Sequence, residues 1–387
     1  MAVANVSEVR PLNRVTLSHN QISEVRALTG LRGVAALYVV LFHFFSPLPL
    51  TSPAMCFLGH GYLAVDIFFT LSGFVMALNY VGLFSGGVRT ATVRTFFSRR
   101  FARIYPLYLV TLLIATALVA GGHLDFSGRS VAQAFPANLF MVQNWGNWES
   151  IENPAWSIST EWFAYLLFPF LVRWIFFRLR AVAIVLGLFS VGGLIWLSLN
   201  FSNPYDHTKI LDLTHGYISL IRCVSEFTLG MLVYRMRDTR LGAKLKRLPW
   251  LALCAVVVLV VLLSIRKADL AVVLFVPLLI VALDGEKNVV SQFLGSRAPE
   301  FLGLISFSVY LLHYLFVPLL NRLDGYVHGT GRHHSHTYAA AVVFPLLLVC
   351  ATATYYAVEV PARRGLRKLF EGNGRATPSL GQPAVKS

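Results

Sequence analysis

The sequence is poor in charged residues, and poorest in acidic ones. Only 13% of its 387 residues are Asp, Glu, Lys or Arg, whereas 56% are apolar, and 18 acidic residues stand against 33 Lys and Arg. A soluble chain needs about 25% charged residues to cover its surface. The composition therefore excludes an ordinary soluble protein and predicts an integral membrane protein.

The sequence also has few residues that bind metals. Four cysteines, spread over the chain, show no metal or redox spacing, and we expect them to serve packing. They are Cys56, Cys223, Cys254 and Cys350. Four histidines gather in "HGTGRHHSHT", residues 328–337, without fixed ligand spacing or nearby carboxylates, so a solvated loop is favoured over a metal site. They are His328, His333, His334 and His336. We expect no metal.

What the sequence has in abundance is long apolar stretches, each able to cross a hydrocarbon core of about 30 Å as a helix. About ten are counted. They cover residues 29–48, 60–80, 104–121, 161–178, 181–199, 214–234, 248–265, 269–284, 302–321 and 337–358. We therefore expect an all-α integral membrane protein in three parts: an N-terminal segment 1–27, a transmembrane domain 28–360, and a basic, then disordered, tail 361–387.

The positive charges predict the orientation. With both termini in the cytoplasm, 25 of the 33 Lys and Arg fall in cytoplasmic segments, six in outward loops, and Arg32 and Arg222 inside spans. The segments 1–27 and 361–387 are then cytoplasmic. Topology and attraction to anionic membrane lipids explain the net charge of +15, so no nucleic-acid partner is needed.

Two ionisable residues mark one face of the first apolar stretch. Eleven residues separate Arg32 from His43, about three helical turns and a rise of roughly 16 Å, so both side chains share a face. In a purely structural interpretation, Arg32 extends its side chain to the lipid headgroups and His43 lies at the outer interface. Ionisable residues inside a membrane more often face a cavity or a partner, which favours a functional site.

Further polar residues follow in the next stretches. Asp66 needs a partner or water, while Ser72 and Gly73 permit close helix contact. In "FFSRRFARIYPLYL" a basic cluster precedes the third stretch; an ordinary positive-inside cluster is one interpretation. Because Arg100 and Arg103 are spaced i, i+3, a phosphate-bearing cytosolic ligand is the other.

The later stretches carry the remaining candidates. In "NPAWSISTEWF" an Asn-Pro turn leads into a helix, where Ser157 is interpreted as an N-cap and Glu161 as a first-turn carboxylate, both explicable without catalysis. Arg222 and Glu226, spaced i, i+4, predict a structural ion pair. The stretch "LGLISFSVYLLHYLF" contributes Tyr310 and His313.

Together these segments resemble the acyltransferase-3 family of integral-membrane acyltransferases, which O-acylate cell-surface glycans. The resemblance runs from about residue 23 to 368. It rests on the following matches: the spaced pair Arg32 and His43; Phe68 to Phe74 for "FFxLSGF"; Arg100, Arg103, Ile104, Pro106 and Tyr108 for "RxxRIxPxY"; Trp156, Ser157 and Glu161 for "WSxxxE"; Ser306 to His313; and Glu359 with Pro361 for "ExP". Some relatives carry an added soluble hydrolase-like domain that this chain is too short to hold, so we expect the membrane domain or a separate protein to complete the transfer.

The resemblance implies a multi-pass enzyme of the bacterial inner membrane, with acetyl-CoA as donor because acetyl is the commoner donor in the family. His43 is then the general base and Arg32 positions the donor or stabilises charge. Glu161 or Asp66 orients the imidazole or binds the acceptor. The resemblance further implies that Arg99, Arg100 and Arg103 hold CoA phosphates. Trp156, Ser157, Tyr310 and His313 are implied to bind the acceptor, a glycan that is either free or lipid-linked.

Two other classes fit a membrane chain with buried polar residues. A secondary transporter would use them as a relay and would show broken helices in corresponding positions of two halves, a symmetry that the sequence lacks. A glycan exporter would perform no chemistry. Release of labelled acyl groups from CoA by purified protein separates an enzyme from both.

Overall fold

The computed structural model describes residues 19–45, 52–126, 128, 130–146, 148–201, 211–284, 288–330 and 335–371, with side chains from Arg26 to Phe370. The regular structure in these ranges is helical throughout. Residues 1–18 of the expected N-terminal segment, the tail 372–387 and the pair His333 and His334 lie outside the described residues. The disorder of the tail therefore stays a prediction.

Each of the ten apolar stretches contains a helix. These helices are α1 (His19–Phe45), α3 (Ala64–Tyr80), α4 (Thr90–Ala120), α6 (Trp156–Phe177), α7 (Arg180–Asn200), α8 (Gly216–Met236), α10 (Leu251–Leu263), α11 (Asp269–Leu283), α13 (Arg297–Leu312) and α15 (Ser335–Thr354). The other helices are α2 (Pro53–Gly59), α5 (Val131–Leu139), α9 (Arg240–Lys246), α12 (Val289–Leu294), α14 (Val317–Gly329) and α16 (Val360–Glu371). The all-α membrane fold is confirmed.

Within the described ranges, eight spans are long and apolar enough to cross a membrane. The two remaining expected spans are short. Helix α10 has 13 residues and follows α9 at an 84° bend, and α11 has 15 residues, so neither reaches much beyond about 22 Å. The short link 264–268 makes α10 and α11 a hairpin, which returns the chain to its starting side. If α9 and α10 are counted as one bent span, the described residues hold nine candidate spans.

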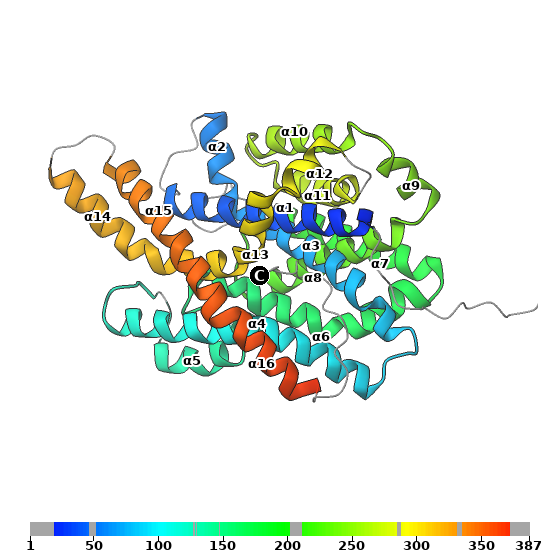
Figure 1. The fold of residues 1–387 in the computed structure, drawn as a ribbon, viewed down its shortest axis with the longest axis horizontal. Coiled ribbons are helices and arrows are strands. Elements are labelled where there is room, and N and C mark those ends of the chain that lie inside the picture. The colour runs from blue at the N-terminus through cyan, green and yellow to red at the C-terminus, as the bar shows by residue number, and fades with distance from the viewer. Residues whose placement is uncertain are drawn as a thin grey trace, which may run out of the picture.

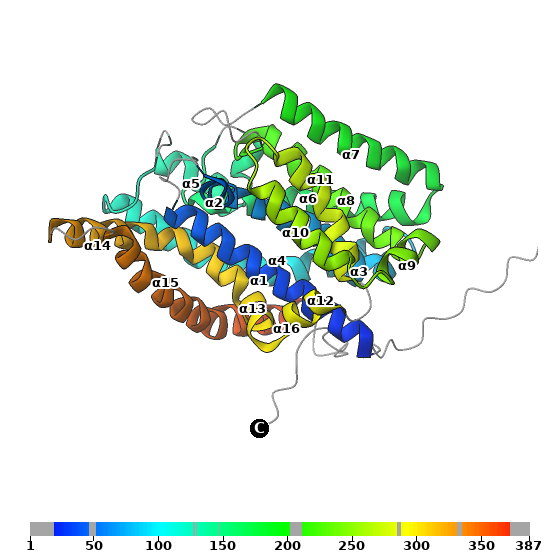
Figure 2. The ribbon, with the colours of Figure 1, turned by 90° about the horizontal axis from the view of Figure 1, so that it is seen from above.

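Segments predicted to face the cytoplasm and segments predicted to face outward lie at opposite ends of the long axis of the molecule. Basic α9 and the N-terminal end of α1 lie at one end, whereas α5 and α14, from segments predicted to face outward, lie at the other (Figure 1). The same separation is visible from above (Figure 2). This arrangement agrees with the charge distribution, and the cytoplasmic placement of the basic end stays a prediction.

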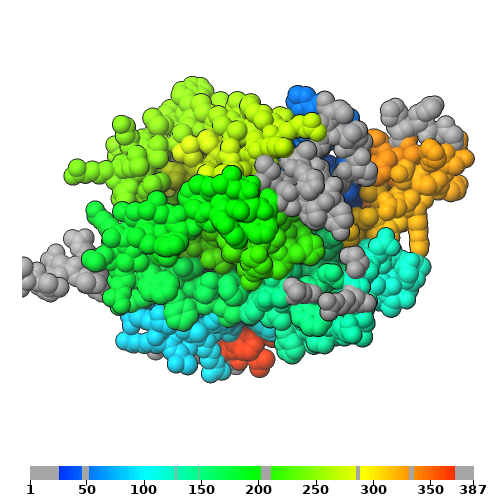
Figure 3. Space-filling view, turned by 180° about the vertical axis from the view of Figure 1, so that it is seen from behind, coloured from blue at the N-terminus to red at the C-terminus, as the bar shows by residue number. Residues whose placement is uncertain are grey.

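Much of the side surface is apolar, as a lipid-facing surface must be. Helix α7 crosses the back of the molecule (green in Figure 3) and exposes large side chains. They include Ile184, Leu188, Phe189, Ile195, Trp196 and Leu199, of which Leu199 is 78% exposed. In water such a continuous apolar face would aggregate, so it supports the membrane assignment independently of helix length.

Glycines bring two helix pairs into backbone contact. At the crossing of α3 and α8, a Cβ on Gly73 would lie 1.9 Å from the Phe227 carbonyl oxygen, and one on Gly230 equally close to that of Thr70. At the crossing of α1 and α13, a Cβ on Gly303 would lie 1.9 Å from the Thr29 carbonyl oxygen. No larger residue fits at these crossings. The packing role expected for Gly73 is confirmed.

Candidate active site

A cavity of about 140 Å³ lies where α1, α3, α4, α6 and α13 meet. Its polar lining brings together residues that are widely separated in the sequence. They are Arg32, Ser72, Arg100, Arg103, Ser157, Glu161, Tyr165, Ser306 and Tyr310. Eight of the eleven residues predicted for the site either line this cavity or contact a lining residue through a hydrogen bond or ring contact; they are Arg32, Arg100, Arg103, Trp156, Ser157, Glu161, Tyr310 and His313.

Glu161 lies in the middle of this lining. Its Oε1 accepts a hydrogen bond from the Tyr165 hydroxyl at 2.5 Å and another from the Ser72 hydroxyl. Helix α6 begins at Trp156, so Glu161 stands in its second turn rather than its first. The interpretation of Glu161 as a first-turn carboxylate was wrong. The turn Asn153–Ala155 leads directly into α6, so the helix begins at Trp156, earlier than the sequence pattern predicted. The carboxylate faces the cavity instead of the helix end.

The arginine cluster of α4 forms one end of the cavity. The Arg100 guanidinium donates to the Tyr80 hydroxyl at 3.0 Å and lies over the Tyr80 ring, 5.2 Å from its centroid. Arg103 is ion-paired with Glu359, whose other oxygen accepts from Ser308 at 3.3 Å. The third cluster member, Arg99, does not line the cavity. The i, i+3 spacing therefore directs Arg100 and Arg103 to the site.

Glu359 reaches Arg103 from a distorted turn of helix. Residues Tyr355–Glu359 form a π-helical turn, η6, between α15 and α16. Such turns are rare and recur at functional sites, because the inserted residue re-aims its side chain. The "ExP" match of the sequence thus corresponds to a real structural feature at the end of the cavity that holds the arginines.

Positive charge exceeds negative charge around the cavity. Three arginines, Arg32, Arg100 and Arg103, face two carboxylates, Glu161 and Glu359, and Arg32 interacts electrostatically with both carboxylates and with Arg103. A surplus cation in a poorly hydrated site is costly unless an anion joins it. The charge balance therefore favours an anionic ligand.

The opposite end of the cavity is formed by Ser157 and Tyr310. Their hydroxyls are 2.7 Å apart and both lie 3.0 Å from the Pro154 carbonyl oxygen, so two hydroxyl hydrogens are shared among these three oxygens. The N-cap interpretation of Ser157 was wrong: the N-cap of α6 is Ala155, and the Ser157 hydroxyl bonds back to the turn Asn153–Ala155. That turn consequently holds both hydroxyls in place.

His43 lies just beyond this end. It does not line the cavity, but its Nδ1 is 3.1 Å from Nε2 of His313, and the His313 ring is 5.8 Å from that of Tyr310. His313 is fully buried, whereas His43 is partly exposed. Arg32 and His43 thus share a face of α1 as expected, with Arg32 in the cavity and His43 past its far end.

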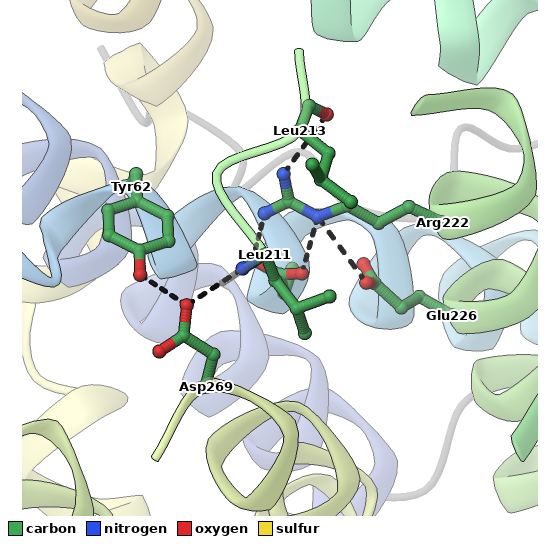
Figure 4. Close-up of polar contacts among 7 residues, drawn as sticks. Tyr62, Leu211, Leu213, Arg222, Glu226 and Asp269 are labelled. Carbon is green, nitrogen blue, oxygen red and sulfur yellow. Dashed lines mark hydrogen bonds and ion pairs between the residues drawn. The ribbon is translucent and has the colours of Figure 1, made fainter. Parts of the chain in front are cut away.

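Asp66 and Trp156 belong to a neighbouring buried cluster around Arg222, whose contact with Glu226 is drawn in Figure 4. Arg222 Nε donates to Asp66 Oδ1 at 2.9 Å, and the Arg222 NH2 group donates to the second Asp66 oxygen. The side chains of Arg222, Asp66 and Glu226 are all inaccessible to solvent. The expected Arg222–Glu226 pair is present at 3.7 Å, but Asp66 is the closer partner. The Arg222 guanidinium also lies 5.7 Å from the Trp156 ring centroid. This cluster fixes the start of α6.

The cluster continues to a carboxylate that the sequence patterns did not single out. Asp269, at the start of α11, accepts from the Leu211 amide at 2.9 Å and from the Tyr62 hydroxyl (Figure 4). Its only local signal was a position in the first turn of an apolar helix. Sequence reasoning likewise missed Tyr165, which an apolar stretch with i, i+4 spacing to Glu161 could have indicated.

The buried carboxyl Glu152 lies outside the eight candidate spans. Glu152 precedes the turn that carries Pro154, is inaccessible to solvent and lies next to Thr111. Burial disfavours its charged form and raises the pKa of Glu152 to about 8, although the Thr111 hydroxyl opposes the shift. At neutral pH this group is mostly protonated.

The described residues contain no cluster of three or more His, Cys, Asp or Glu that could hold a metal ion. His336 bonds to Asp324 at 3.0 Å and to the Phe44 carbonyl, which ties α15 to α1. Of the four cysteines, Cys56 and Cys223 are buried. These placements agree with structural roles.

Comparison with known proteins decides the family. The sequence profile of the acyltransferase-3 family, described as an acyltransferase domain, matches residues 25–358. The chain belongs to this family.

Named relatives agree with that membership. Acyltransferase MdmB of Streptomyces mycarofaciens is 36% identical over 163 residues, 40% of each chain. Protein 2 in the picA locus of Rhizobium radiobacter is 35% identical over 157 residues, 35% of this chain and 75% of that protein. O-acetyltransferase OatA of Staphylococcus aureus (strain NCTC 8325 / PS 47) is 24% identical over 374 residues, 89% of this chain and 58% of that protein. The chain thus spans about two fifths to three fifths of MdmB and OatA, and no solved structure matches.

Every motif on which the acyltransferase-3 resemblance rested lies in the matched range, except the closing Glu359 and Pro361 just beyond it. The structure groups Arg32, the α4 arginines, Ser157, Glu161 and Tyr310 around one cavity. The chain is therefore a multi-pass membrane member of the acyltransferase-3 family in which one cavity joins many of the motif residues.

Proposed function

We propose that this acyltransferase moves an acyl group, most often acetyl, from cytosolic acetyl-CoA to a hydroxyl of a cell-surface glycan, in the bacterial inner membrane. The observation that carries the proposal is the cavity that runs from Arg100 and Arg103 to Tyr310, with His43 and His313 next to its far end. The name of the relative OatA, an O-acetyltransferase, supports acetyl as the group transferred.

The donor is proposed to bind at the arginine end. CoA carries a pyrophosphate and a 3′-phosphate, and guanidinium groups bind phosphate oxygens through paired, charge-assisted hydrogen bonds. The surplus positive charge of Arg32, Arg100 and Arg103 fits such a ligand. The pantetheine arm would then extend through the cavity past Glu161, whose carboxylate can accept an amide N–H. Arg99, outside the lining, is assigned to attracting the donor from the cytosol.

The reaction proposed is direct transfer with His43 as general base. The acceptor hydroxyl gives its proton to the neutral imidazole while its oxygen attacks the thioester carbonyl. The C–S bond breaks, and the CoA thiolate takes the proton from the imidazolium. General-base catalysis of this kind contributes typically about 10²- to 10⁴-fold. The Tyr310 and Ser157 hydroxyls, at the end of the cavity nearest His43, are assigned to binding the acceptor.

Asp66 and Trp156 receive supporting roles in this proposal. Both carboxylate oxygens of Asp66 accept hydrogen bonds from Arg222, and Arg222 lies against the Trp156 ring. We therefore assign Asp66 and Trp156 to holding the start of α6, and with it Ser157, rather than to the reaction. A covalent relay through His43 or Ser157 is the alternative to direct transfer. It predicts an acylated protein that can be trapped when the acceptor is withheld.

Binding of the donor is tested with purified protein in nanodiscs. Arg100→Ala/Arg103→Ala should weaken CoA affinity at least tenfold, whereas Arg94→Ala, an exposed arginine of the same helix, should leave it unchanged. If the wild type, the Arg100→Ala/Arg103→Ala variant and the Arg94→Ala variant bind CoA with equal affinity, the arginines serve only the positive-inside distribution of charge. Hydrolysis or transfer of labelled acetyl from CoA distinguishes the enzyme from a transporter or exporter.

The base is tested by His43→Ala, which should insert and fold normally but lose transfer by about 10²-fold or more. His328→Ala, at an exposed histidine of α14, serves as the control. Retention of most of the rate by His43→Gln would contradict the assignment. For the direction of transfer, vesicles receive acetyl-CoA only on the face that carries Arg103 and a soluble glycan only on the other; acetylated glycan confined to the CoA side would refute transfer across the membrane.

A further inference from the structure

Two histidines that are 270 positions apart in the chain are in hydrogen-bond contact. His43, in the last turn of α1, and His313, which begins the turn His313–Phe316 after α13, place Nδ1 and Nε2 3.1 Å apart, with ring centroids at 4.9 Å. The close crossing of α1 and α13 at Gly303 brings their helices together. The contact therefore belongs to a helix pair whose backbones touch.

The other partners of the two rings define where the protons lie. Nδ1 of His313 is 2.5 Å from the Tyr310 carbonyl oxygen, and Nδ1 of His43 is 3.1 Å from the Val39 carbonyl oxygen. A carbonyl oxygen can only accept a hydrogen bond, so both Nδ1 atoms must carry hydrogen. A neutral His313 then has a lone pair at Nε2, and the one hydrogen on Nδ1 of His43 is shared between that lone pair and the Val39 carbonyl oxygen, each at 3.1 Å.

We infer that His313 is a positioning residue that holds His43 as the tautomer with hydrogen on Nδ1. In that tautomer Nε2 of His43 carries the lone pair that takes the acceptor's proton. This inference rests on the proposed role of His43 as general base, and it replaces direct acceptor binding as the role of His313. A base oriented by a third group is a recurring device in nucleophilic catalysis.

The carboxylates expected to orient the imidazole are occupied elsewhere. Asp66 is bound to Arg222, and Glu161 accepts from Ser72 and Tyr165. A neutral histidine suits the position better than a carboxylate, because it accepts a hydrogen bond without a buried negative charge. His313 is fully enclosed, so its ring cannot turn away from His43 to bond with water.

Two amide substitutions separate the two hydrogen bonds of His313. The side chain of Asn overlaps Nδ1, so His313→Asn keeps the bond to the Tyr310 carbonyl but has no acceptor for His43. The longer side chain of Gln places its carbonyl oxygen near Nε2, so His313→Gln keeps the acceptor. We expect His313→Asn to lower kcat about 10- to 100-fold with little change in KM for either substrate, and His313→Gln to recover most of the loss.

The tautomer is read directly from ¹⁵N chemical shifts of histidine-labelled protein in nanodiscs, without any activity measurement. Wild type and His313→Gln should show hydrogen on Nδ1 of His43, and His313→Asn should show a mixture or the other tautomer. Hydrogen on Nε2 in the wild type overturns the inference even if no variant folds. Equal loss in both variants, or a change confined to KM for the acceptor, also overturns it, because packing or acceptor binding would then explain His313.

These outcomes are distinct from failure of the proposed function. If His43→Ala retains transfer, the general base is wrong whatever the tautomer. If His43 is essential but His313→Asn matches wild type in rate and tautomer, the base stands and the Val39 carbonyl alone orients it.

Discussion

Replacement of Asp66 tests whether this carboxylate supports the fold or the chemistry. Asp66→Ala leaves the Arg222 guanidinium, which is inaccessible to solvent, without its two hydrogen bonds from Nε and NH2. Breaking a buried pair on one side costs about 3–5 kcal/mol. Glu226 Oε1 remains 3.7 Å from Arg222 Nε and offsets part of the loss, so we expect the lower end, about 3 kcal/mol. The folded fraction relative to the unfolded one should fall by roughly a hundredfold.

Unfolding would be followed in one detergent by intrinsic fluorescence, alongside transfer activity per folded molecule. The control is Glu300→Ala, which removes a pair with the half-exposed Arg26 at 3.2 Å and should cost less than about 1 kcal/mol. The triple variant Asp66→Leu/Arg222→Met/Glu226→Leu should regain most of the stability, because no charge of this cluster is then left buried. A fully stable Asp66→Ala protein without transfer activity would refute this reasoning and place Asp66 in the catalytic machinery.

Three further perturbations are informative. The pKa of Glu152 in the folded protein, about 8, lies above the ordinary value of 4.5, so the free energy of unfolding should fall as pH rises between these values. Glu152→Gln should remove this pH dependence, measured as the difference in melting temperature between pH 5 and pH 9. An unchanged difference in the variant would contradict the prediction. Gly303→Val should separate α1 from α13 and lower both thermal stability and transfer, whereas Gly325→Ala, in open space, should change neither; equal melting temperatures would refute the close crossing. Fused reporters should read cytoplasmic after Arg94, Arg240 and Arg375 and outward within 122–150 and 328–336, and a reversed pattern would place the donor site on the wrong side.

The helices and the membrane assignment could be predicted because their causes are local. Apolar runs such as 181–199 need no partner in order to be helical, since a helix satisfies all its backbone groups internally. Helix ends were less predictable. Ser157 fits the N-cap pattern in letters, but the Asn-Pro turn continues directly into the helix and commits its hydroxyl to Pro154.

The candidate site was predictable to the extent that it depends on spacing within one helix. Arg32 and His43 share a face of α1, and the i, i+3 spacing sends Arg100 and Arg103 to one cavity, because helical geometry fixes both arrangements. The partners of these residues were not predictable. Arg103 meets Glu359 across 256 positions, and nothing in either local sequence specifies that meeting.

By itself, the sequence determined that this chain is a helical membrane protein of the acyltransferase-3 family, with its arginines and histidine at set depths along their helices. Only the tertiary structure decided which carboxylates remain near the cavity. Asp66 and Glu161 look alike as single acids in apolar helices, yet the glycine-mediated crossing of α3 and α8 delivers Asp66 to Arg222, while Glu161 faces the cavity. The physical reason is that a buried charge takes whichever partner the helix packing brings within hydrogen-bond distance, and packing is a property of the whole chain.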